Sequence, residues 1–417
     1  MEEKKELKIK FRTVVILLIL LAIIIVVALV IMMNKNKETK TIGGKTSTQE
    51  RNDFSMEFLR LENKKENIVY SPLSIKYALN MLNEGANGNT KTQIENVIKG
   101  LNLTKYAPIN EVLSLANSVY IRDTYAEYIK EDYKDILSEK YNAEINYDSF
   151  SNATNINKWI ENKTLGIIQN MLDDNAVQNP ATNMILINAL AIDMEWANAF
   201  DTNDTYGEVF KLDNGDEMTA TMMHKETKSQ AVAYYKDRKT TALAMDLKKY
   251  DDTQLQFVAI MPKDTLSKYV DDFTIDDLNQ IISKLTLSSE EKYGVDISIP
   301  KFSFDYDLNL KEDLMDLGIT DAFNENLADF SNMADTDFYV GDALHKADIE
   351  FSEEGIRAAA VTAFTMETSA MKDETKPEEI KIDRPFLYFI RDKETNEIWF
   401  TGTVYEPNSW EEDKGEY

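Results

Sequence analysis

Residues that could carry out catalysis or bind a metal are scarce in this chain. It contains no cysteine, which excludes disulfides, thiol catalysis and cysteine-ligated metals. Its two histidines, His224 and His345, leave little from which to build a Ser-His-Asp triad or a site with several histidine ligands. We therefore expect no catalytic set, no metal site, no cofactor and no enzymatic activity.

The most unusual pattern lies between Glu353 and Met366. Alternate side chains of a strand face opposite sides, and one alternate set here is free of charge: Ile356, Ala358, Ala360, Thr362, Phe364 and Met366. The other set begins with Arg357 and ends with Glu367. The polar run 368–379 follows, where an exposed loop is expected. The segment is thus a loop with the pattern of a half-buried strand. An ordinary edge strand or an alanine-rich helical turn is the alternative.

The composition predicts a folded and strongly acidic protein. Of the 417 residues, 43% are hydrophobic and 29% are charged, which is enough for one large core and argues against global disorder. The formal net charge is −27; residues 1–52 contribute +5 and the remainder −32. An acidic surface repels phosphates, so we expect no nucleic-acid partner.

The N-terminal part has the pattern of a membrane anchor. A short basic tail, residues 1–12, precedes residues 13–33, which contain no charge, glycine or proline. As a helix this run would extend over ~31 Å, close to the ~30 Å of a bilayer core. A cleaved signal peptide is the rival interpretation, but no small-x-small cleavage site precedes Asn34. We expect an uncleaved transmembrane helix, followed by a flexible linker over 34–52.

The numbers of basic residues on the two sides of this run differ by only one, so they predict its orientation weakly. Five Lys/Arg precede residues 13–33, and four lysines closely follow them. This excess favours an inside N-terminus. We expect a single-pass protein of the cell membrane, with its folded domain on the extracellular side of a bacterial cell.

The rest of the chain predicts an α+β domain over 53–410, followed by an acidic tail at 411–417. Apolar spacing and helix-start signals predict helices at 55–61, 75–83 after Ser71-Pro72, 92–98, 132–139, 155–172 and 308–317. Strand patterns cover 118–121, 184–194, 231–261, 295–304 and 347–351, with a hairpin of 386–391 and 398–404. Helices come mostly first and strands mostly later, without a βαβ rhythm, which is typical of the α+β class.

About ten short motifs, in this order, resemble the serpin (serine protease inhibitor) family over nearly all of 53–407. They are Ser71-Pro72-Leu73-Ser74-Ile75, Gly85-Ala86, Asn157 to Ile168, Leu186-Ile187-Asn188-Ala189, Pro300-Lys301-Phe302, Leu317-Gly318, Asp321-Ala322-Phe323, Ala328-Asp329-Phe330-Ser331, His345-Lys346-Ala347, Glu353-Glu354-Gly355, Arg384-Pro385-Phe386-Leu387 and Gly402. Each motif alone is weak, and their common order carries the resemblance.

The resemblance implies three β-sheets, eight or nine helices and an exposed reactive-centre loop at about 355–379. It further implies a monomer that traps a target serine protease in a covalent complex. The protease cleaves the loop, and the freed segment inserts into the largest sheet as a new strand. A serpin-fold surface protein that binds a partner without trapping proteases is the alternative.

The family pattern also assigns roles to residues of the loop. The hinge comprises Glu354, Gly355, Ile356, Arg357, Ala358, Ala359, Ala360, Val361 and Thr362. Ile356 departs from the usual Thr or Ser, but it is apolar, so insertion is expected to be slowed rather than blocked. The spacing from Gly355 gives a window for the cleaved bond, with Ser369–Ala370 preferred and Met371 as its limit. A small residue there suits elastase-like or subtilisin-like proteases, whereas Lys372, just outside the window, leaves trypsin-like targets as a minority option.

Other matched residues are implied to be structural. Ser71, Ser74, Asn188 and His345 resemble the family's hydrogen-bonded shutter under the largest sheet. Trp196 resembles the tryptophan of the breach, where insertion starts, although an ordinary core tryptophan would explain it equally well.

Overall fold

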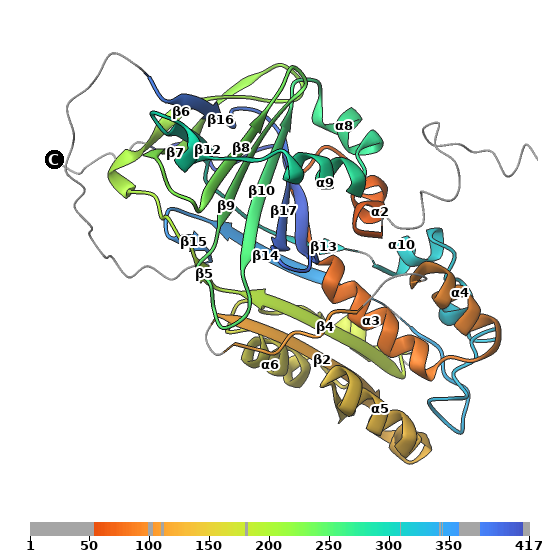
Figure 1. Ribbon diagram of the computed structural model, residues 1–417. Coiled ribbons are helices and arrows are strands. Elements are labelled where there is room, and N and C mark those ends of the chain that lie inside the picture. Colours follow the sequence, from red (N-terminus) through yellow and green to blue (C-terminus); the bar gives the residue numbers. More distant parts are fainter. Residues whose placement is uncertain are drawn as a thin grey trace, which may run out of the picture. The chain divides into compact units, whose positions relative to one another are not determined.

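The computed structural model describes residues 54–98, 103–109, 112–179, 182–308, 310–341, 343, 345–357 and 376–411 (Figure 1). Within these residues no helix is both long enough and apolar enough to cross a membrane. The expected anchor at 13–33, like the linker and residues 412–417 of the acidic tail, lies outside the described residues.

Nine α-helices and four short 3-10 helices lie in the described part of the chain. They are α2 (Phe54–Leu61), α3 (Pro72–Gly85), α4 (Gly88–Ile98), η2 (Asp123–Tyr128), α5 (Glu131–Tyr141), α6 (Thr154–Lys163), α7 (Asp174–Gln178), η3 (Thr202–Asp204), α8 (Leu266–Asp272), α9 (Ile275–Ser283), η4 (Ser288–Glu290), α10 (Leu310–Asp316) and η5 (Asp321–Phe323).

Two of the four sheets form the upper part of Figure 1. The seven-stranded sheet has the order β1 (Ile68–Tyr70), β18 (Ile398–Val404), β17 (Phe386–Asp392), β10 (Leu255–Pro262), β9 (Thr240–Asp246), β8 (Val232–Lys236) and β11 (Thr286–Leu287). The second has the order β16 (Glu378–Lys381), β12 (Val295–Pro300), β7 (Glu217–Thr227) and β6 (Thr205–Lys211). The predicted hairpin is confirmed by the antiparallel pairing of β17 with β18.

The other two sheets meet at an open boundary. One has the order β3 (Glu144–Asp148), β2 (Leu113–Arg122) and β4 (Met184–Ile192); the other has β13 (Phe302–Leu308), β14 (His345–Phe351), β15 (Gly355–Ile356) and β5 (Met194–Glu195). Among the described residues no strand pairing joins β4 to β14. The expectation of three sheets is therefore corrected to four within the described residues, because the sheet into which the family pattern inserts the loop is divided between these two strands.

Local sequence signals explain where α3 begins and why α6 is short. The Ser71 hydroxyl caps α3 by accepting from the Ser74 amide, and Pro72 occupies the first turn. The helix expected over 155–172 ends at Lys163, so that prediction was too long. Leu165 and Gly166 have φ angles of 60° and 75°, which a right-handed helix does not contain.

The helices cover both faces of the β2–β4 sheet. Figure 1 shows β4 and β2 between α3 on one side and α6 on the other. Ile156 and Ile160 of α6 pack in one core cluster with Ala116 of β2 and Ile187 of β4. The cluster is separate from the main core, so this half of the divided sheet has its own hydrophobic support.

Candidate functional site

The hinge begins with a tight turn after β14. The Ser352 amide donates to the Gly355 carbonyl at 3.0 Å, and the chain then reverses into β15. Glu353, in the turn, is buried but is held by an ion pair with Lys301 at 2.7 Å and a hydrogen bond from the Thr205 hydroxyl at 2.8 Å. Burial acts to raise the pKa of Glu353, but these two partners outweigh it and the pKa lies below its usual value.

Gly355 and Ile356 of the expected hinge lie inside the sheet. Ile356 pairs with Phe351 of β14 on one side and Met194 of β5 on the other, and Gly355 pairs with Glu195. The Ile356 side chain is 2% exposed, and a β-carbon at Gly355 would collide with the Met194 carbonyl. The structure thus gives Ile356 a place in the core, although its effect on the rate of insertion stays a prediction.

The chain leaves the sheet at Arg357. This residue has a φ of 50°, in the left-handed region that non-glycine residues seldom occupy. Its amide donates to the Glu350 carbonyl at 2.7 Å, and its guanidinium pairs with Asp348 at 2.6 Å. Arg357 therefore directly follows the two paired residues of β15.

Trp196 packs against the C-terminal end of β14 and the turn that follows it. Its indole nitrogen donates to the Ser352 carbonyl at 2.9 Å, and its ring lies edge-on to Phe351 with centroids 5.1 Å apart. Its amide donates to the Glu354 carbonyl at 2.8 Å. Trp196 thus contacts both β14 and the hinge turn, where the family pattern places the breach.

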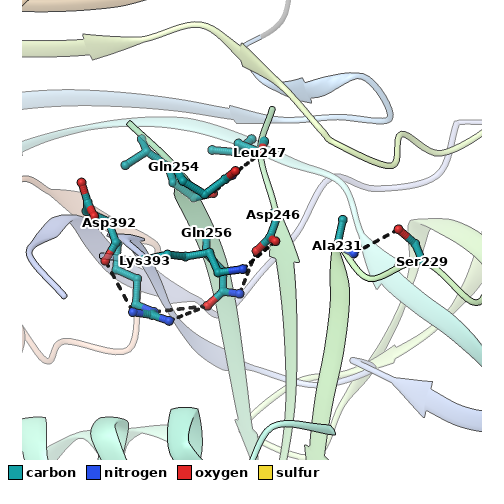
Figure 2. Close-up of polar contacts among 10 residues, drawn as sticks. Ser229, Ala231, Asp246, Leu247, Gln254, Gln256, Asp392 and Lys393 are labelled. Atoms are coloured by element: carbon teal, nitrogen blue, oxygen red, sulfur yellow. Dashed lines mark hydrogen bonds and ion pairs between the residues drawn. The ribbon is translucent and has the colours of Figure 1, made fainter. Parts of the chain in front are cut away.

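A polar network fixes the C-terminal end of β9, next to which Trp196 forms a bridge. Trp196 forms an isolated bridge with Leu247, and the Ala197 amide donates to the Asp246 carbonyl at 2.9 Å. Figure 2 shows Asp246 beside Gln256 and Lys393, which bind its two carboxylate oxygens at 2.8 Å each. Sequence analysis did not identify this network, because Lys393 is 147 residues from Asp246 in the chain and the contact depends on which strands become neighbours.

Ser71, Ser74, Asn188 and His345 meet beneath the boundary between β4 and β14. The Ser71 amide donates to Nε2 of His345 at 3.0 Å, and the Ser74 hydroxyl donates to the Asn188 carbonyl at 3.3 Å. Burial lowers the pKa of His345 to about 4, so the imidazole is neutral at pH 7 and acts as an acceptor. These four residues join α3 to both halves of the divided sheet.

Asn117 is a member of this cluster that sequence analysis missed. It lies directly opposite Asn188 in the β2–β4 ladder, accepts a hydrogen bond from the Asn188 carboxamide and donates to the Tyr141 carbonyl at 3.0 Å. The Asn188 side-chain oxygen is buried and has no hydrogen-bond partner among the described residues. In the sequence, Asn117 is a polar residue in the run Ala116-Asn117-Ser118, next to an expected strand. This polar residue was the signal by which the cluster member could have been found.

A small apolar cavity lies at the same boundary. Its volume is 20 Å³, and it is lined by Leu186 and Asn188 of β4, His345 of β14 and apolar side chains of α3 and α10. This volume holds about one water molecule. The two halves of the sheet therefore approach each other here without close packing.

β16, at the C-terminal end of the expected loop, lies at the edge of a different sheet. β16 pairs in parallel with β12 through four residues. Two ion pairs hold it, Lys236 to Glu378 at 2.8 Å and Lys381 to Glu208 at 2.6 Å.

A row of three carboxylates crosses the same sheet. Asp296 of β12 lies opposite Glu226 of β7 and Glu379 of β16. Burial, together with these two neighbours and Glu208, raises the pKa of Asp296. Like charges that are directly opposite destabilise a sheet, so this row weakens the attachment of β16.

Several expected site residues cannot be placed. Hinge residues Ala358 to Thr362 and the bond window Ser369, Ala370 and Met371 lie outside the described residues. Within the described part of the chain, no group of three or more His, Asp or Glu side chains is arranged to hold a metal ion.

The family model described as "Serpin (serine protease inhibitor)" matches residues 49–407. An uncharacterized serpin-like protein of the archaeon Methanosarcina mazei is 30% identical over 363 residues, which cover 82% of each chain. Serpin B10 of Sorex araneus is 31% identical over 401 residues and the human leukocyte elastase inhibitor 29% over 364; the matches cover 85% and 82% of this chain, and 98% and 93% of those proteins. Relatives in archaea and mammals do not single out the expected bacterial source.

Solved structures show the same fold. The native thermophilic serpin tengpin superposes with a TM-score of 0.71 at 28% identity, covering 87% of this chain and 95% of its own. Human thyroxine-binding globulin superposes with a TM-score of 0.72 at 27% identity, covering 87% and 98%. Because the family model matches residues 49–407, most of the chain, this protein belongs to the serpin family.

Proposed function

We propose that this serpin is an irreversible inhibitor of serine proteases that acts by inserting its cleaved loop between β4 and β14. The observation that carries the proposal is the position of β15, which already lies between β14 and β5, the short strand that directly follows β4 in the chain. Insertion then needs the existing ladder to be extended, and no new strand has to be nucleated.

The residues that follow β15 suit this extension. If the ladder continues from the pair Ile356–Phe351, residues 358, 360 and 362 face the same side as Ile356, which is the core. Those residues are Ala, Ala and Thr. None carries a charge, so their burial would not incur the large free energy cost of an unpaired buried charge.

The chemistry of the trap follows from peptide-bond cleavage by a serine protease. The protease serine attacks the carbonyl carbon of Ser369 and forms an ester, while the Ser369–Ala370 bond breaks and Ala370 leaves with a free amino group. Insertion of the segment that ends at Ser369 carries the esterified protease with it. The small side chain of Ser369 suits an elastase-like or subtilisin-like target.

The remaining parts of the proposal concern location and assembly. Residues 13–33 would anchor the protein in a cell membrane as a single span, with the serpin domain on the extracellular side, and the protein would act as a monomer. A binding protein that does not trap proteases is the second candidate, because thyroxine-binding globulin, named as a binding protein, has the same fold.

Gel electrophoresis under denaturing conditions tests the proposal. The full chain, kept in mild detergent, is mixed with elastase-like, subtilisin-like and trypsin-like proteases, and the released C-terminal peptide is identified by mass spectrometry. A stable covalent band and a peptide that begins at Ala370 are the expected result. Cleavage by every protease without a covalent band, and without a rise in melting temperature, would contradict inhibition and favour the second candidate.

A further inference from the structure

We propose that Arg357 sets the register in which the loop enters the sheet, by pairing with acidic side chains on the outer face of β14. This inference rests on the proposed function, because it concerns an inserting loop. Arg357 would be a positioning residue and would not touch the reacting bond.

The outer face of β14 presents an ordered set of charges. Its inward side chains, His345, Ala347, Ile349 and Phe351, are buried, and the alternate positions are Lys346, Asp348 and Glu350. The Arg357 amide already bonds to the Glu350 carbonyl at 2.7 Å. In this antiparallel register Arg357 lies opposite Glu350 and diagonal to Asp348, within reach of a long side chain.

Asp348 depends on Arg357 for its charge partner. It lies opposite Asp305 of β13, which is a like-charge pair, and Lys346 is engaged by Asp305 at 3.0 Å and Asp307 at 3.2 Å. Among the described residues, Arg357 is the cation that forms an ion pair with Asp348, at 2.6 Å. The two side chains are only 31% and 28% exposed, so the two groups are partly shielded from water.

Other registers lose this match. A slip of one residue would turn Arg357 toward the core, on the face where Ile356 now lies. A slip of two residues toward Ser352 would remove Arg357 from Asp348. A slip of two residues in the other direction would place it opposite Asp348, but also diagonal to Lys346, a like charge. Only the observed register gives Arg357 two acidic neighbours and no basic one on this strand.

The same contact can persist during insertion. Arg357 must change from its left-handed φ to an extended one for the strand to continue, but its side chain stays on the outer face in both cases. The ion pair would therefore hold the first residue pairs of the ladder in place while the following residues pair.

Charge reversal tests the proposal in the full chain. The variants are Arg357→Asp, Asp348→Arg and the double exchange, with Lys163→Gln as a control that removes a distant ion pair to Glu144. The readouts are the moles of serpin consumed per mole of protease trapped and the rise in melting temperature after loop cleavage. We expect each single variant to raise consumption roughly two- to fivefold, as suits a partly exposed pair, and the double exchange to recover part of the loss.

The outcomes separate this inference from the proposed function. If the wild type traps protease and gains stability on cleavage, but Arg357→Asp and Asp348→Arg match it in both readouts, the register proposal is wrong and inhibition stands. It is also wrong if the double exchange recovers nothing. If the wild type neither traps protease nor gains stability, the proposed inhibition fails and the register proposal fails with it.

Discussion

The segments at the two ends of the proposed reactive loop, β15 with Arg357 and β16, are attached to the domain in opposite ways. At the N-terminal end, Ile356 is buried between two strands, and Arg357 meets an acidic partner at 2.6 Å. At the C-terminal end, β16 lies at the edge of its sheet and pairs through four residues with one neighbour. Glu379 in β16 faces Asp296, and Asp296 faces Glu226, so the charges there are alike.

We infer from this difference that the N-terminal end of the proposed loop is the end that favours entry into the divided sheet. Apolar burial and complementary charge favour entry of the N-terminal end into the divided sheet. The C-terminal end depends instead on Lys236 and Lys381, which form ion pairs with Glu378 of β16 and Glu208 of β6. Changes at the N-terminal end should therefore alter trapping, whereas changes at the C-terminal end should alter how firmly β16 is held.

The largest expected effect is that of Ile356→Arg. An unpaired charge at this buried position costs about 3–5 kcal/mol, so we expect the hinge to leave the sheet and the protein to be cleaved as a substrate. The measurement is the ratio of covalent complex to cleaved serpin on a denaturing gel. Ile356→Thr, the residue type usual in inhibitory relatives, is the matched control and should keep trapping. An unchanged ratio for Ile356→Arg would contradict the role of the seated hinge.

A smaller effect is expected when the two lysines that hold β16 are replaced. Lys236→Met with Lys381→Met removes both ion pairs and leaves Glu378 and Glu208 without these cationic partners. Partly exposed pairs contribute about 0.2–1 kcal/mol each. Amide hydrogen exchange should accelerate in 378–381 and stay unchanged in 355–357. Lys163→Met, on α6, should change neither segment, and equal acceleration at both ends would show that they are not independent.

The smallest effect is that of Asp296→Asn, and it depends on pH. The raised pKa of Asp296 means that the folded protein retains a proton at pH values where the unfolded chain has lost it. Its contribution to stability is thus fully present below the usual Asp pKa of 3.8 and is lost as the pH rises through the raised value. Asp296→Asn should be more stable than the wild type at pH 7 and show a weaker fall in stability with rising pH. Urea unfolding at several pH values measures this; parallel pH profiles would contradict it.

The sequence alone determined the features that depend on neighbours along the chain. The alternation from Ile356 onward, the start of α3 at Ser71-Pro72 and the hairpin of β17 and β18 are written in short runs of residues. The order of short motifs was enough to identify the serpin resemblance and the α+β class. Each of these signals spans only a few residues, so local geometry suffices to interpret it.

The tertiary structure decided everything that depends on which strands become neighbours. Asn117 opposite Asn188, Asp348 beside Arg357 and the row Glu226, Asp296 and Glu379 follow from strand register. Alternation tells which face a side chain occupies but not which strand lies beside it. The boundary between β4 and β14 has the same origin, because a sheet is opened or closed by contacts between distant segments that no local pattern records.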